Sequence, residues 1–103
     1  MNFKAAAEQG HPKAYNLVGI CYLKGQGTSK DPATAVKYFH KGMNLMNAEA
    51  INNLGLCYDQ GIGVDRDPRL AYKYYKHAAE LGNKTAQKNV DTIDSLREEA
   101  KKN

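Results

Sequence analysis

The sequence has 103 residues, of which 42% are hydrophobic and 25% are charged, and its formal net charge is +4. This length suits a single domain, and the composition is that of a globular chain rather than of a disordered segment or a membrane protein. No apolar run approaches the roughly 20 residues that a bilayer span requires, so we expect no direct membrane insertion. The basic residues are spread along the chain, which argues against a nucleic-acid partner.

The first unit that can be recognised along the chain predicts a helix, a glycine-containing loop and a second helix. Apolar residues of the first helix follow the spacing of one helix face, namely Ala14, Leu17, Val18, Cys21 and Tyr22. Gly25 then supplies the left-handed residue that ends a helix. Asp31 is expected to cap the second helix, with Pro32 at its first position, and Gly42 lies near its end.

The same pattern recurs 36 residues later without a gap. Residues 14–43 and 50–79 are identical at 12 of 30 positions, which chance does not produce. Both copies keep the glycine pair of the loop, which is Gly61 and Gly63 in the second copy, followed by the Asp67-Pro68 cap. Because the pair follows a helix and precedes an acidic cap, it indicates the turn of a helical hairpin and not a phosphate-binding loop. Asn47 and Asn83 are expected to cap the helices that follow each unit.

The 36-residue period also extends outward. Residues 6–14, AAEQGHPKA, match residues 78–86, AAELGNKTA. The single domain of residues 1–103 therefore divides into a half-repeat at 1–13, repeats at 14–49 and 50–85, and a last helix at 86–103. The half-repeat is either a capping unit or the edge of a piece cut from a longer array, and we favour the second interpretation. In the last helix Asp91 and Asp94 replace the glycine and tyrosine of the repeat, which predicts a C-terminal capping helix with a polar outer face.

Residues 54–82, LGLCYDQGIGVDRDPRLAYKYYKHAAELG, resemble the Sel1-like repeat, a relative of the tetratricopeptide repeat. The resemblance covers nearly the whole chain. It implies an all-α fold, a right-handed α/α superhelix or solenoid built of helical hairpins. It also implies a non-catalytic adaptor or scaffold that holds a peptide or protein on the concave surface lined by the first helix of each unit.

The candidate partner-binding residues are those in phase with this surface but outside the core of each unit: Asn16, Ile20, Leu23, Asn52, Leu56, Asp59, Lys88 and Thr92. The asparagines carry both a donor and an acceptor for an extended peptide backbone, and the aliphatic residues would form an apolar stripe. The alternative is that the asparagines satisfy neighbouring helix ends and the aliphatic residues pack between units. The sequence leaves both open.

No catalytic, cofactor or metal site is expected. His11, His40 and His77 lie at different phases of different units, and no metal-binding or redox spacing is present. Cys21 and Cys57 occupy the same position in successive units, where packed helices place equivalent atoms about 10 Å apart. A disulfide requires Cα atoms within about 7 Å, so we expect two buried free thiols.

The function that these features favour is a protein–protein interaction module. The alternative is a structural solenoid segment that stacks on itself through exposed terminal helices such as Phe3–Gln9. A cytoplasmic location is favoured, because no secretion signal precedes the repeats. The endoplasmic reticulum lumen or the mitochondrion stays open if the chain is part of a longer protein. Asn83 also begins a glycosylation sequon, but we favour its role as a helix cap, because a three-residue motif often arises by chance.

Overall fold

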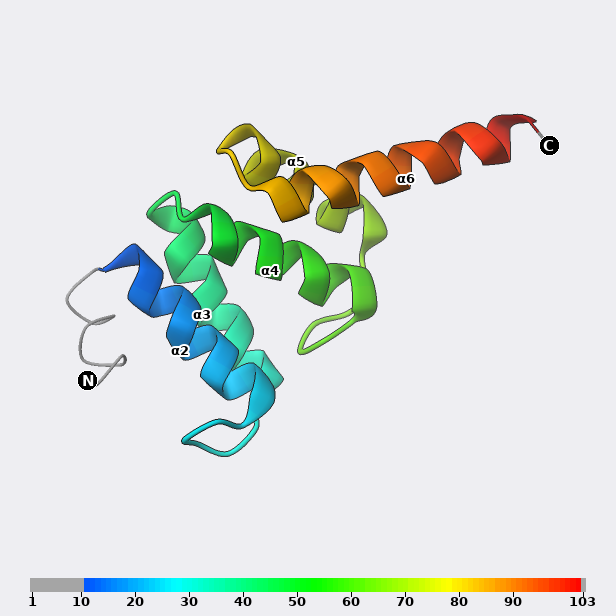
Figure 1. Ribbon diagram of the computed structural model, residues 1–103. Coiled ribbons are helices and arrows are strands. Elements are labelled where there is room, and N and C mark those ends of the chain that lie inside the picture. Colours follow the sequence, from blue (N-terminus) through cyan, green and yellow to red (C-terminus); the bar gives the residue numbers. More distant parts are fainter. Residues whose placement is uncertain (1–10, 103) are drawn as a thin grey trace.

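The computed structural model describes residues 11–102, and helices are the only regular secondary structure in this range (Figure 1). The all-α prediction is confirmed. Two helical hairpins are followed by a longer helix, in the order α2 (Pro12–Lys24), α3 (Pro32–Asn44), α4 (Ala48–Gln60), α5 (Pro68–Glu80) and α6 (Lys84–Lys102). Most of the predicted half-repeat, and the segment Phe3–Gln9 proposed for self-association, lie outside the described residues.

Helices α3 to α6 each begin behind a side-chain cap. The carboxylates of Asp31 and Asp67 accept a hydrogen bond from the backbone N–H three residues later, at 3.2 Å in both units. The side-chain oxygens of Asn47 and Asn83 accept the equivalent bond at 2.9 and 2.8 Å. Each cap satisfies one of the backbone donors that a helix start leaves unpaired. All four predicted caps are therefore confirmed.

The first helix of each hairpin ends at a left-handed glycine. Gly25 has φ 74° and Gly61 has φ 70°, and their backbone N–H groups donate to the carbonyls of Cys21 and Cys57. A side chain at such a φ is disfavoured because its Cβ approaches the following carbonyl. The glycines thus end the helices where the sequence predicts.

Gly42 lies near the end of helix α3, as expected, but it does not end the helix. Gly42 is buried inside α3, where an added Cβ would lie 2.6 Å from the Cβ of Ala50. The left-handed residue is Met46, with φ 62°, at the position that Gly82 occupies one unit later with φ 96°. Gly42 therefore serves close packing between α3 and α4, and Met46 adopts a backbone conformation that glycine would adopt with less strain.

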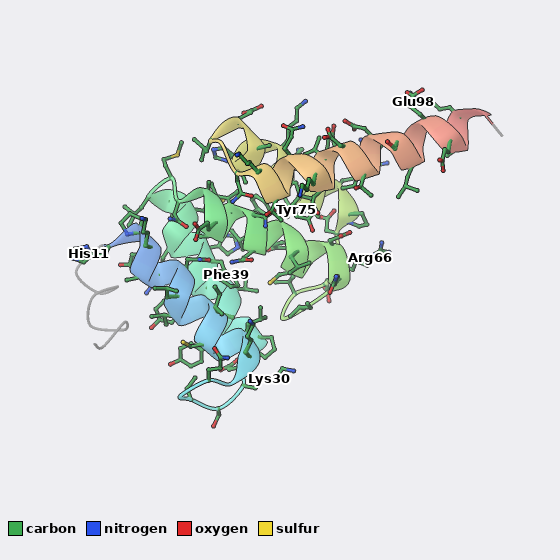
Figure 2. The ribbon with its side chains drawn as sticks, in the orientation of Figure 1. His11, Lys30, Phe39, Arg66, Tyr75 and Glu98 are labelled. Carbon is green, nitrogen blue, oxygen red and sulfur yellow. The ribbon has the colours of Figure 1, made fainter. Side chains whose placement is uncertain are left out.

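Within each hairpin an aromatic ring lies against a helix glycine. An added Cβ would lie 2.5 Å from Phe39 Cε1 at Gly19 and 2.6 Å from Tyr75 Cδ1 at Gly55. Phe39 is 0% and Tyr75 2% exposed, and they belong to the second helices of their units, α3 and α5 (both residues are labelled in Figure 2). The glycines thereby let the two helices of a unit approach until the ring contacts backbone. The buried core surrounds these contacts and includes Ala35, Val36, Ala50, Ile51, Leu54, Cys57, Ala71 and Ala78.

Replacing Gly19 by alanine is expected to destabilise the protein by about 1–3 kcal/mol, because the new methyl group would overlap the buried Phe39 ring. The sign of the stability change reports on this overlap, because Gly→Ala inside a helix without such a contact stabilises by roughly 1 kcal/mol. Urea unfolding followed by circular dichroism measures the change. The matched control is Gly19→Ala combined with Phe39→Leu, which should lose less than the sum of the two single variants. Strictly additive losses would show that the two side chains do not share this space.

Candidate functional site

The eight candidate residues all lie on α2, α4 and α6, which are the first helices of successive units. In Figure 1 these helices lie toward the viewer, with α3 and α5 behind them. We call the surface of α2, α4 and α6 that carries the candidate residues the first-helix face. Its side chains differ in how far neighbouring units already use them.

Asparagine pairs join successive first helices, and we call Asn16, Asn53, Asn52 and Asn89 the asparagine ladder. Asn53 Nδ2 donates to Asn16 Oδ1 at 2.7 Å, and Asn89 Nδ2 donates to Asn52 Oδ1 at 3.2 Å. Both bonds span 37 residues, so the same contact is made twice along the array. In each pair the donor belongs to the later unit.

The two predicted asparagines are used differently. Asn16 is only 3% exposed, and its Nδ2 also donates to Glu49 Oε2 at 3.4 Å. Its amide is thus engaged on both sides within the protein, by side chains of α4 and not by the backbone of a neighbouring helix end. Asn52 is partly exposed, and among the described residues its Nδ2 donates no side-chain hydrogen bond. Asn52 therefore keeps a donor for a partner, whereas Asn16 does not.

Asn53 and Asn89 were not predicted, and Leu17 was wrongly assigned to the core face. Leu17 is 39% exposed and lies 36 residues before Asn53, at a position that faces the preceding unit in the later repeats. Leu17 satisfies helical periodicity but not this packing. The signal for this contact is the recurrence of Asn53 as Asn89, 36 residues later. Asn89 lies beyond the two full units, which differ at this position.

The three aliphatic candidates divide in the same way. Ile20 and Leu23 are partly buried and pack against the core cluster that α3 and α4 form around Phe39 and Leu54. Leu56 is partly exposed and is not among the side chains packed on the core clusters of the described residues. Leu56 is therefore the aliphatic candidate most open to a partner.

The remaining candidates lie at the edge and on the last helix. The carboxylate of Asp59 accepts a hydrogen bond from the Tyr75 hydroxyl at 3.3 Å, and its backbone carbonyl accepts one from Arg66 Nε at 2.8 Å. Lys88 and Thr92 are exposed on α6, where the Thr92 hydroxyl donates to the backbone carbonyl of Lys88 at 2.9 Å. The structure thus brings Asn52 and Leu56 together on α4, and places Lys88 and Thr92 on the neighbouring helix.

The comparisons with known proteins agree with the repeat geometry. The Sel1 repeat model matches residues 1–11, 12–44 and 48–83, which is most of the chain. The chain belongs to the Sel1 repeat family. Sel1 repeat proteins are generally protein-interaction modules and are typically non-catalytic. The search of curated proteins gave no match.

Solved Sel1 repeat structures have the same fold, and each alignment covers 82% of this chain. A Sel1 repeat protein from Oxalobacter formigenes aligns with a TM-score of 0.81 at 34% identity, over 35% of its own length. A protective antigen of uropathogenic Escherichia coli strains, with an SLR fold, aligns with a TM-score of 0.79 at 34% identity, over 18% of its length. The cysteine-rich protein B of Helicobacter pylori aligns with a TM-score of 0.78 at 26% identity, over 63% of its length. The solenoid prediction is confirmed, and the chain spans less than two thirds of each of these proteins.

The Cys57 thiol and the His40 imidazole are packed inside the Sel1 repeats, and neither is arranged as a catalytic group. Burial raises the pKa of the Cys57 thiol to about 11, so it stays protonated and unreactive near neutral pH. His40 lies edge-on to Tyr58 and Tyr74, at 6.4 and 6.3 Å between ring centroids, and its burial lowers its pKa.

Within residues 11–102 no cluster of His, Cys, Asp and Glu is arranged to hold a metal ion. No helix in the same range has the length and apolar character of a membrane span.

The asparagine ladder predicts unequal effects at two equivalent positions. Asn53→Ala leaves the buried Asn16 oxygen without its donor and should destabilise the Sel1 repeats by about 1–3 kcal/mol. Asn89→Ala is the matched control, because water can reach the partly exposed Asn52, and the loss should be about 1 kcal/mol or less. Urea midpoints at constant slope would measure both. Equal losses at the two positions would contradict the difference in burial.

The two thiols should differ in reactivity. Both are free; Cys57 is 0% exposed with a raised pKa, whereas Cys21 is partly exposed. A thiol reagent at mildly alkaline pH should therefore modify Cys21 quickly in the native protein and Cys57 only on unfolding. Mass spectrometry counts the labels, and Cys21→Ser should leave the native protein almost unlabelled. Rapid double labelling without denaturant would show that Cys57 is accessible.

Proposed function

We propose that this chain is a non-catalytic protein-interaction module that binds an extended segment of a partner protein along the first-helix face. The proposal makes this face the concave surface of the solenoid. It rests on the general role of Sel1 repeat proteins and on the side chains that this chain leaves available there. Nucleic acid and membrane insertion have no part in it.

One observation carries the proposal: Leu56, exposed enough to be reached, lies one helical turn from the free donor of Asn52. An extended peptide has backbone carbonyls that accept from an asparagine amide and side chains that can cover an aliphatic contact. Lys88 and Thr92 on α6 would extend the contact toward the C-terminus with an ammonium and a methyl group. Asn16, Ile20 and Leu23 have a supporting role: their contacts hold α2 against the next unit.

The test is a set of peptides selected from a random library against the whole chain. Those that bind the first-helix face should lose at least tenfold in affinity, about 1.4 kcal/mol, on Leu56→Glu, which places a charge against their apolar contact. Lys88→Glu should change their salt dependence. Fluorescence anisotropy gives the dissociation constants.

The matched control is Lys73→Glu, an exposed position on the second helix of the same unit. Circular dichroism establishes that each variant keeps its helix content. Selected peptides that bind Leu56→Glu as well as the unmodified chain, and lose affinity on Lys73→Glu, would move the binding surface to the opposite side and refute the proposal.

A further inference from the structure

A cavity of about 330 Å³ lies between the C-terminal half of α6, the end of α4 and the loop that joins α4 to α5. Its apolar wall is formed by Pro68, Ile93 and Leu96, and its polar wall by Asp59, Arg66 and Arg97. Leu96 is 59% exposed, which is high for a leucine beside a cavity. In Figure 2 Arg66 lies on the loop below the projecting part of α6.

The repeat itself indicates what such a surface accepts, because the equivalent surface 36 residues earlier is occupied. The loop after α4 packs against the backbone of Pro32, where an added Cβ on Gly63 would lie 2.5 Å from the Pro32 carbonyl oxygen. Ile62 and Val64 on either side are partly buried against the adjoining core. An apolar–glycine–apolar segment therefore covers the surface at Pro32, and only glycine permits the close approach.

The surface at Pro68 receives no such loop from the described chain. Helix α6 continues to Lys102, and Arg97 and Glu99 occupy the positions equivalent to Gly61 and Gly63. The chain therefore does not turn where the preceding unit turns. The cavity is the unfilled counterpart of a contact that the protein makes once within itself.

The charges at the cavity favour an acidic residue next to that segment. Arg66 uses Nε to reach the Asp59 carbonyl, and the Arg97 guanidinium lies 4.3 Å from the centre of the Tyr72 ring. Neither arginine forms an ion pair within residues 11–101. The Asp59 carboxylate is already bonded to the Tyr75 hydroxyl. Two guanidinium groups thus keep unused donors that suit a carboxylate.

We propose that this cavity binds an extended segment of another protein with the pattern apolar, glycine, apolar, acidic. The apolar side chains contact Ile93 and Leu96, the glycine lies against the backbone at Pro68, and the carboxylate meets Arg66 and Arg97. This surface shares only Asp59 with the candidate residues of the first-helix face, and the proposal does not rest on the binding proposed for that face.

The probe is a blocked peptide, Gly-Ile-Gly-Val-Asp, which has the sequence of residues 61–65. Added at about 1 mM to the full chain, it should shift the amide resonances of Ile93, Leu96 and Arg97 in a heteronuclear NMR titration. Alanine in place of the central glycine should weaken binding at least tenfold, because its methyl group would meet the backbone at Pro68. Lysine in place of the aspartate should weaken it to a similar degree.

Leu96→Glu and Arg97→Gln in the protein should each weaken binding of the same peptide at least tenfold. Both side chains are exposed in the C-terminal half of α6, and circular dichroism tests that the fold is kept. Leu56→Glu and Lys88→Glu should leave this binding unchanged, so failure here is distinguishable from failure of the first-helix face. Absence of shifts at about 1 mM, or equal binding of the alanine peptide, would overturn the proposal. So would concentration-dependent self-association abolished by Leu96→Glu, which would assign the cavity to a second copy.

Discussion

The contact of an aromatic ring with helix backbone is the constraint on which the other packing depends. Gly19 under Phe39 and Gly55 under Tyr75 bring the helices of a unit together at a fixed depth. Because the ring can lie only where no Cβ stands, the contact also fixes which residues of the first helix face outward. The orientation of each first helix on its own unit is set by these two buried contacts.

Apolar and polar contacts have separate tasks in this fold. The buried rings and alanines hold the two helices of a unit together, whereas the asparagine ladder adds hydrogen bonds between units at the edge of the core. An amide pair is directional in a way that aliphatic packing is not, so it specifies the register of one unit on the next. Most of the polar capacity of the ladder is therefore internal, and a partner depends chiefly on Asn52 and on the side chains beside it.

The sequence alone predicted the contacts that are local. Caps such as Asp31 and left-handed turns such as Gly25 depend on a few consecutive residues, and both recur at the 36-residue period. Asn16 and Leu17 were placed less well, because their surroundings are decided by the unit that lies next to them. The cavity beside Leu96 was not foreseen, since it arises where a helix continues in place of a turn.

The ladder gives the array a direction. Each pair takes its acceptor from the earlier unit and its donor from the later one, and Asn16 and Asn52 both offer the acceptor. Lys88 stands at the next equivalent position, and its ammonium group can only donate. A unit transplanted behind α6 would face a donor with a donor, whereas one inserted behind α4 would find its complement. Exchange of units between arrays of this kind is thus governed by hydrogen-bond polarity as well as by shape.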